Sequence, residues 1–177
     1  MTRIFAGCIL SLVLVLALGG TALASPLTPA GDGNFVIFGE YACDGYMFPS
    51  YQGLGVGVGY GITDCLTIGA EAMFMPGWTL YGAFINAAFG PVLVDCDVLY
   101  NGMDLFAKAA ALYCFEIDAL KLAFGGGIMA DTKHDYRWGY LEASASLDMD
   151  PFSIYGKLDY ALNPGFLTYE LGFALTL

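Results

Sequence analysis

The chain has 177 residues, a length that suits one domain. Hydrophobic residues make up 58% of it and charged residues only 13%, whereas an ordinary soluble domain carries about 25% charged residues. The net charge is −11, from 17 acidic residues and six Lys and Arg. Because phosphate binding needs clustered basic side chains, nucleic acid is excluded as a partner.

The first 24 residues predict a secretory signal peptide. Arg3 stands near the start, an apolar run covers residues 4–18, and Ala22-Leu23-Ala24 forms a cleavage site of small residues. An uncleaved membrane anchor is the alternative, because the run is nearly long enough to span a bilayer. After cleavage, five basic and 17 acidic residues leave a net charge of −12. Residues 25–34, which contain PLTPAGDG, then predict a flexible N-terminal segment before a single domain at 35–177.

Short segments of alternating apolar and polar residues fill the rest of the chain. Turn signals such as TDC at 63–65 and NPG at 163–165 separate them, and the period of two predicts strands. No apolar run after the leader reaches the about 18 residues of a helical membrane span. We expect ten strands, at residues 35–45, 54–63, 66–75, 79–89, 91–100, 104–116, 119–130, 137–148, 152–162 and 166–177.

Each predicted strand offers a run of alternate apolar residues that contains no Asp, Glu, Lys or Arg, such as Leu141, Ala143, Ala145 and Leu147 in the eighth strand. An exported and very apolar chain without helical spans can cross a membrane only as a closed barrel. The sequence therefore predicts an all-β fold, a closed antiparallel up-and-down transmembrane β-barrel of about ten strands, with eight as the alternative count. Its exterior would face lipid, and its lumen would be partly filled. The charged residues of the opposite faces would line the lumen: Glu40, Glu71, Asp95, Asp97, Lys108, Lys121, Glu142, Lys157, Asp159 and Glu170.

Glycine occupies every second position from Gly53 to Gly61. The residues between, such as Val56 and Val58, would face lipid. The glycine face would then look into the lumen, beneath bulky residues such as Phe106 or Tyr155 from other strands.

Aromatic residues provide a second sign of a membrane barrel. With both termini on the periplasmic side, they fall into two girdles on the lipid-facing surface, as in outer-membrane barrels. The predicted outer girdle consists of Tyr41, Phe74, Tyr81, Tyr100, Tyr160 and Tyr169. The predicted inner girdle consists of Phe35, Tyr60, Phe89, Tyr113, Phe152 and Phe173.

With these patterns, the chain resembles the small bacterial outer-membrane β-barrels of the OmpA- and OmpX-like class, which are porin-like proteins. The final segment LTYELGFALTL is similar to their C-terminal assembly signal, although family members usually end in Phe and this chain ends in Leu177. The resemblance implies a monomer in the Gram-negative outer membrane. Its partners would be the lipid bilayer with its lipopolysaccharide leaflet and, during biogenesis, the barrel-assembly machinery.

The lumen-facing charges allow two interpretations. Lys108, Lys121 and Lys157 could form an internal ion-pair network with neighbouring carboxylates, because buried charges persist only when paired or hydrated. Alternatively, the surplus carboxylates could line a narrow water path that favours cations, with Asp95 and Asp97 as its best candidates. The predicted function is accordingly either a structural role in the envelope or a narrow cation-favouring pore for small solutes.

Two other functions remain open at this stage. One is a soluble periplasmic β-barrel with inverted faces that binds an apolar ligand. The other is an envelope enzyme that uses His134, the only histidine, flanked by Asp131 and Asp135. No serine stands out as a partner for His134, so we expect that the protein is not an enzyme and has no catalytic residue.

The cysteines of the predicted domain are Cys43, Cys65, Cys96 and Cys114. They have no C-x-x-C spacing, and the chain has one histidine, so we expect neither a metal site nor a cofactor. Cys65 and Cys114 both lie near the inner rim but about three strands apart, which is beyond disulfide reach. We therefore expect free thiols.

Overall fold

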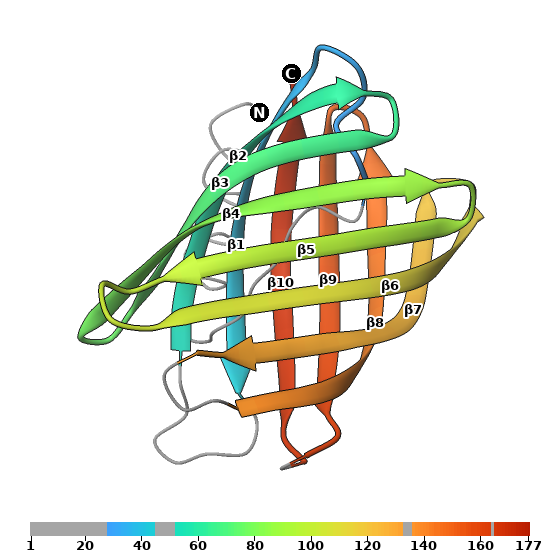
Figure 1. Cartoon of the computed structure of the whole chain (residues 1–177). Helices are drawn as coiled ribbons and strands as arrows, with labels where there is room; N and C mark the ends of the chain where they lie inside the picture. Colours follow the sequence, from blue (N-terminus) through green and yellow to red (C-terminus); the bar gives the residue numbers. More distant parts are fainter. Residues whose placement is uncertain (1–27, 45–51, 133–135, 164) are drawn as a thin grey trace, which may run out of the picture.

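The computed structural model describes residues 28–44, 52–132, 136–163 and 165–177. Over these residues the chain forms a closed antiparallel barrel (Figure 1). In chain order the strands are β1 (Phe35–Asp44), β2 (Gln52–Thr63), β3 (Leu66–Met75), β4 (Trp78–Phe89), β5 (Val92–Tyr100), β6 (Leu105–Ile117), β7 (Leu120–Asp131), β8 (Tyr136–Met149), β9 (Phe152–Ala161) and β10 (Leu167–Thr176). The predicted signal peptide and His134 lie outside the described residues.

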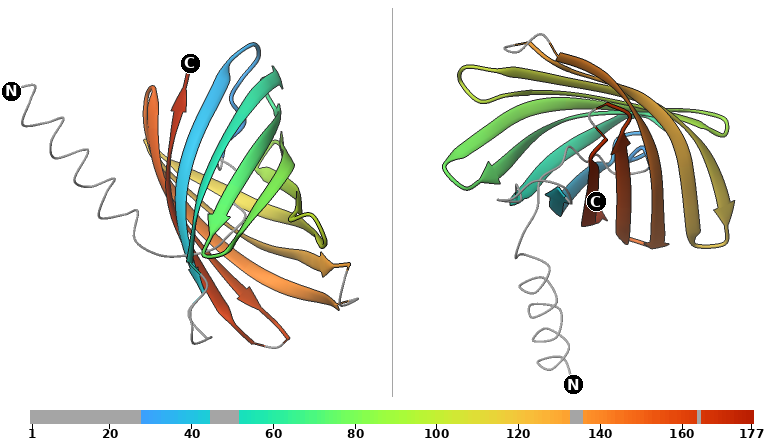
Figure 2. Two further views of the ribbon diagram at one scale, coloured as in Figure 1. Left: turned by 90° about the vertical axis from the view of Figure 1, so that its left-hand side faces the viewer. Right: turned by 90° about the horizontal axis from the view of Figure 1, so that it is seen from below.

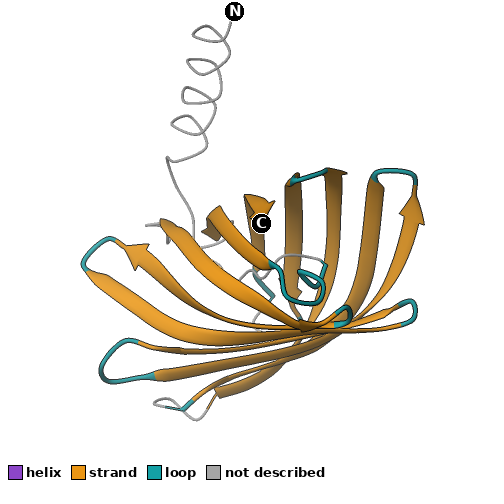
Figure 3. Ribbon diagram, turned by 90° about the horizontal axis from the view of Figure 1, so that it is seen from above, coloured by secondary structure: helices purple, strands orange, loops and turns teal. Residues whose placement is uncertain are grey.

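The predicted strands are confirmed, with every boundary within two residues of the observed one. Ten strands, and not eight, close the barrel. Each strand pairs with its neighbours in the sequence, and β1 pairs with β10 to complete the ring. Seen from above, the described elements are strands connected by loops and turns (Figure 3). In the described part of the chain no helix is long and apolar enough to cross a membrane.

The barrel has two ends that we name by the chain. The terminal end holds Phe35, Leu177 and the turns at 64–65, 90–91, 118–119 and 150–151. The distal end holds the connections at 76–77 and 101–104, together with residues 162–163 and 165–166. Two further views show the tilted strands running between these ends (Figure 2).

The exterior carries the apolar residues that the alternation predicted. Val58 of β2, Ile85 of β4 and Leu158 of β9 lie near the middle of their strands and are each about half exposed. In a protein surrounded by water such a surface would be very unfavourable, whereas in a bilayer lipid chains cover it. The exterior is therefore that of a barrel whose outer wall contacts lipid.

The glycine face of β2 looks into the lumen as expected, but different side chains cover it. A Cβ added at Gly57 would collide with the Phe38 ring, and one added at Gly59 would lie 3.0 Å from Phe84. The expected cover by Phe106 or Tyr155 is wrong for this strand, since Tyr155 lies over Gly172 instead. The neighbouring strand β1 supplies Phe38, which stands directly opposite Gly57 in the strand register, so its ring lies over the glycine.

Residues 28–34 cross the terminal end of the lumen. The Ala30 amide donates to Thr67 Oγ1 (2.7 Å), and the Gly33 amide donates to the Gly61 carbonyl (3.0 Å). Ala30 is buried in one apolar cluster with Phe38 and Phe84. This segment therefore fills part of the lumen at that end.

A charge placed on the lipid-facing wall should destabilise the barrel more, the closer it lies to the centre of the bilayer. Val58→Arg puts a guanidinium near the bilayer centre and should cost about 2–4 kcal/mol, whereas Ile62→Arg on the same face, at the strand end, should cost about 0–1 kcal/mol. Urea unfolding in lipid vesicles, read from the heat-modifiable gel shift, measures both. Equal stability of the two variants would show that this wall does not contact lipid.

Adding a methyl group at the glycine face should also destabilise the barrel. Gly57→Ala forces the buried Phe38 ring to move and should cost about 1–3 kcal/mol. Gly139→Ala is the matched control, because its nearest contact would be Leu162 at 3.3 Å on the exposed wall. The same unfolding measurement compares the two variants. A Gly57→Ala barrel as stable as the control would refute the close packing of Phe38 against Gly57.

Candidate functional site

Nine of the ten predicted lumen charges are buried inside the barrel. They are Glu40, Glu71, Asp95, Asp97, Lys108, Glu142, Lys157, Asp159 and Glu170, each at most 8% exposed. Lys121 differs, since it lies near the terminal end with 22% of its side chain exposed. There its Nζ contacts Asp148 (2.9 Å), Glu116 (3.6 Å) and the Thr28 hydroxyl (3.3 Å).

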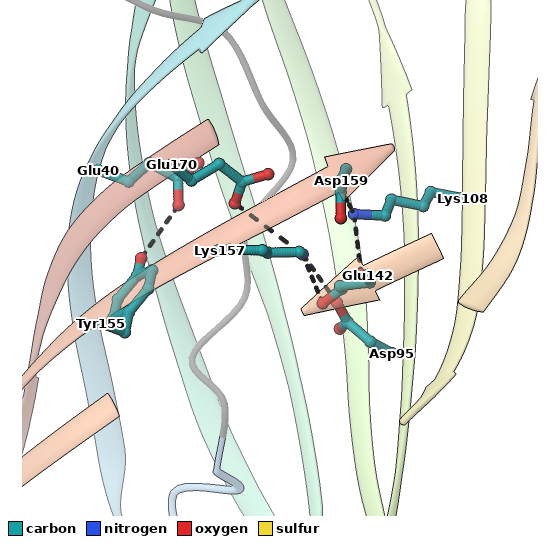
Figure 4. Close-up of polar contacts among 8 residues, drawn as sticks. All are labelled: Glu40, Asp95, Lys108, Glu142, Tyr155, Lys157, Asp159 and Glu170. Atoms are coloured by element: carbon teal, nitrogen blue, oxygen red, sulfur yellow. Dashed lines mark hydrogen bonds and ion pairs between the residues drawn. The ribbon is translucent and has the colours of Figure 1, made fainter. Parts of the chain in front are cut away.

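Lys157 of β9 is the centre of the buried set. Its Nζ lies 3.4 Å from Glu142 Oε1, 3.7 Å from Asp95 Oδ2 and 3.9 Å from Glu170 Oε2 (Figure 4). These carboxylates come from β8, β5 and β10, so one ammonium group connects strands from different parts of the wall. A lysine this deeply buried requires such neighbours, because an unpaired charge in the interior is very costly.

Lys108 of β6 extends the network. Its Nζ donates to Asp159 Oδ2 (2.7 Å), lies 3.4 Å from Glu142 Oε2 and stands 4.8 Å from the centre of the Tyr140 ring. Glu142 therefore contacts both lysines, one with each oxygen. This bridging carboxylate joins the two ion-pair groups into one network.

On the side of β1, aromatic rings fill the lumen next to the buried charges. The Tyr155 hydroxyl donates to Glu40 Oε2 (3.0 Å). Phe38 and Phe84 pack edge to face with ring centres 5.4 Å apart, and both are 1% exposed. We call these three aromatic residues, with Lys108, Lys157 and their carboxylate partners, the central layer. It lies between a cavity of about 210 Å³ at the distal end and one of about 220 Å³ at the terminal end.

Carboxylates outnumber lysines in the lumen. The buried set contains seven carboxylates and two lysines. Glu71 Oε1 and both oxygens of Asp97 have no hydrogen-bond partner among the described residues, although Asp97 is opposite Lys108 in the strand register. Of the two residues expected to line a water path, Asp95 contacts Lys157, whereas Asp97 is fully buried.

The predicted girdle residues lie on the exterior and at the expected ends of their strands. Phe35, Tyr60, Phe89, Tyr113, Phe152 and Phe173 lie toward the terminal end, and Tyr41, Phe74, Tyr81, Tyr100, Tyr160 and Tyr169 toward the distal end. The predicted inner girdle did not include Phe115 and Phe124, two exposed residues that stack with ring centres 5.4 Å apart. Extending the sixth strand's alternation two residues beyond Tyr113 would have found Phe115.

No group of three or more His, Cys, Asp and Glu in the described part of the chain could hold a metal ion. Among the described residues, Cys43, Cys65, Cys96 and Cys114 are not joined in disulfides. The site that the lumen-facing charged residues form is a buried network of ion pairs.

Comparison with known proteins gives structural likeness only. No family model and no curated protein matches the sequence. A de novo designed transmembrane β-barrel is 11% identical over 82% of this chain and 96% of that one, with a TM-score of 0.43. OprG from Pseudomonas aeruginosa is 11% identical over 84% of this chain and 99% of that one, with a TM-score of 0.42. Ail of Yersinia pestis is 13% identical over 82% of this chain and 99% of that one, with a TM-score of 0.35. At these identities no activity or partner is carried over from them.

The buried and peripheral lysines should differ in their effect on stability. Lys157→Met leaves Glu142, Asp95 and Glu170 without their shared ammonium and should cost about 3–5 kcal/mol. Lys121→Met removes a partly exposed ion pair and should cost under about 1 kcal/mol. Urea unfolding in vesicles gives both values; a small cost for Lys157→Met would mean that the central layer does not depend on its ion pairs.

Proposed function

We propose that the protein is an integral outer-membrane β-barrel with a structural role in the envelope and a lumen that is closed at rest. The half-exposed apolar wall supports insertion into a bilayer. The observation that carries the closed state is the central layer, in which Lys157 contacts carboxylates from three other strands at 3.4–3.9 Å. Such a layer leaves no room for the wide water channel of a general porin.

A narrow cation path is the second candidate function. It is favoured by the excess of seven carboxylates over two lysines among the buried residues that were predicted to line the lumen. Movement of Lys157 away from Glu142 would leave an acidic constriction, and rings of carboxylates select cations. In this alternative the same residues that close the lumen at rest would line the path when it opens.

The other functions considered from the sequence have less support. A soluble barrel that binds an apolar ligand needs its apolar faces inside, but Val58, Ile85 and Leu158 are on the exterior and the charges inside. An enzyme based on His134 has no support from the described residues, among which this histidine does not fall. We therefore propose a protein that is not an enzyme.

The path to the membrane is part of the proposal. Residues 1–24 would direct Sec-type export and be removed after Ala24. The barrel-assembly machinery would insert the chain as a monomer, with the terminal end in the periplasm and the distal end toward the lipopolysaccharide leaflet. This orientation places the predicted inner girdle, which includes Phe35 and Phe173, at the periplasmic interface.

Single-channel recording on the refolded protein in planar bilayers tests the closed state. The wild-type barrel should give no steady unitary current in potassium chloride. Lys157→Ala should give cation-selective steps, because it vacates the central layer and leaves its carboxylates. Lys121→Ala, a lysine near the terminal end, is the matched control and should stay silent. Steady cation-selective steps from the wild type would favour the second candidate, and anion-selective steps would contradict both.

A further inference from the structure

The distal end of the lumen contains a cavity that the closed-barrel function does not use. Its volume is about 210 Å³, and its lining includes Trp78, Phe106, Trp138, Phe166, Lys108 and Asp159. A dry apolar cavity of about 150 Å³ holds a benzene molecule. The distal cavity is therefore large enough for a molecule with one ring and a short polar arm.

The wall of this cavity is built to contact an apolar body. Trp78 packs against Phe106 with ring centres 6.5 Å apart, and Trp138 packs against Phe166 at 6.4 Å. The thioethers of Met73, Met75 and Met129 also line it. Aromatic faces and thioethers give strong contacts with flat organic molecules, and the aromatic faces also attract cations.

Three buried polar atoms of the cavity's lining have no hydrogen-bond partner among the described residues: Trp138 Nε1, which can only donate, and two oxygens, which can accept. Asp159 Oδ2 accepts from Lys108, but Asp159 Oδ1 and the Tyr140 hydroxyl have no hydrogen-bond partner among the described residues. Both residues line the cavity and are more than nine-tenths buried, at 7% and 2% exposure. Because an unpaired buried polar group is costly, these atoms indicate a missing partner. An ammonium group can donate to both oxygens at once.

The charge of the lumen selects among possible ligands. Glu142 and Asp97 lie beyond Lys108, and carboxylates outnumber lysines seven to two in the buried set. An anionic ligand would meet the free oxygen of Asp159, the one carboxylate among the described residues that line the cavity. An uncharged ligand would leave the free oxygen of Asp159 with a weaker partner.

We propose that the distal cavity binds a small organic cation, with one aromatic or apolar ring and an ammonium group that donates to Asp159 Oδ1 and the Tyr140 hydroxyl. This binding activity goes beyond the proposed envelope role, which requires only the closed central layer. The ring lies between the Trp78–Phe106 and Trp138–Phe166 pairs. Lys108 stays paired with Glu142 and Asp159 beneath it.

Tryptophan fluorescence tests this site directly, because both tryptophans of the chain, Trp78 and Trp138, line it. The refolded full barrel is titrated with 2-phenylethylammonium, 2-phenylethanol and phenylacetate, which share one ring and differ in charge. We expect saturable quenching by the ammonium compound, binding about tenfold weaker for the alcohol, and no saturable signal with the carboxylate.

Three variants separate the site from partitioning of the probe into detergent. Asp159→Asn should weaken binding of the ammonium compound about tenfold and leave binding of the alcohol nearly unchanged. Ala161→Phe fills the cavity from β9 without removing a charge and should abolish the saturable signal for every probe. Asp148→Asn makes the same change near the terminal end and should behave as the wild type. The heat-modifiable gel shift confirms that each variant is folded.

Equal affinity for the three probes, preference for the carboxylate, or quenching that persists in Ala161→Phe would overturn the proposal. Absence of saturable quenching in the folded wild type would overturn it as well. None of these results would affect the closed state, which is judged separately by single-channel current.

Discussion

Closure of the hydrogen-bond ladder between β1 and β10 is the constraint on which the rest of the structure depends. In a bilayer no water is present to satisfy a free strand edge, so each backbone group must pair within the protein. The register that aligns Gly39 with Phe173 pairs the first strand with the last, and the Phe173 ring then lies 2.9 Å from the place where a Gly39 side chain would begin. Once the ring is closed, every second residue must face the lumen.

The interior follows from that closure. Ten strands enclose a space that side chains can nearly fill, and the glycine face of β2 makes room for Phe38 and Phe84. The charged residues that the alternation turns inward cannot reach bulk water, so they pair with one another around Lys157 and Lys108. The same layer lies between the cavity at the terminal end and the distal cavity, which is lined by aromatic and thioether groups.

The strands were predictable because a period of two and recurrent turn residues are local signals. The same period also predicts that Glu142 and Lys157 face the lumen. The contact between them could not be predicted from the period, because it depends on how the closed wall brings β5, β8, β9 and β10 around one ammonium group. For the same reason the sequence did not indicate which ring packs against Gly57. It also grouped Lys121 with Lys108 and Lys157, although Lys121 lies near the terminal end.

Thiol accessibility along two strands tests the central claim most directly, namely a lipid-facing wall around a closed lumen. In a cysteine-free chain in vesicles, single cysteines replace Ala109, Ala110 and Ala111 of β6, and Ala143 and Ser144 of β8. We predict that a membrane-impermeant maleimide labels none of these positions in the folded barrel and all of them in the unfolded chain, because lipid around 109, 111 and 143 prevents formation of the reactive thiolate and packing covers 110 and 144. Labelling of 110 or 144 by the impermeant reagent would reveal a water-filled lumen, and labelling of 109 or 111 by it would contradict a wall in lipid.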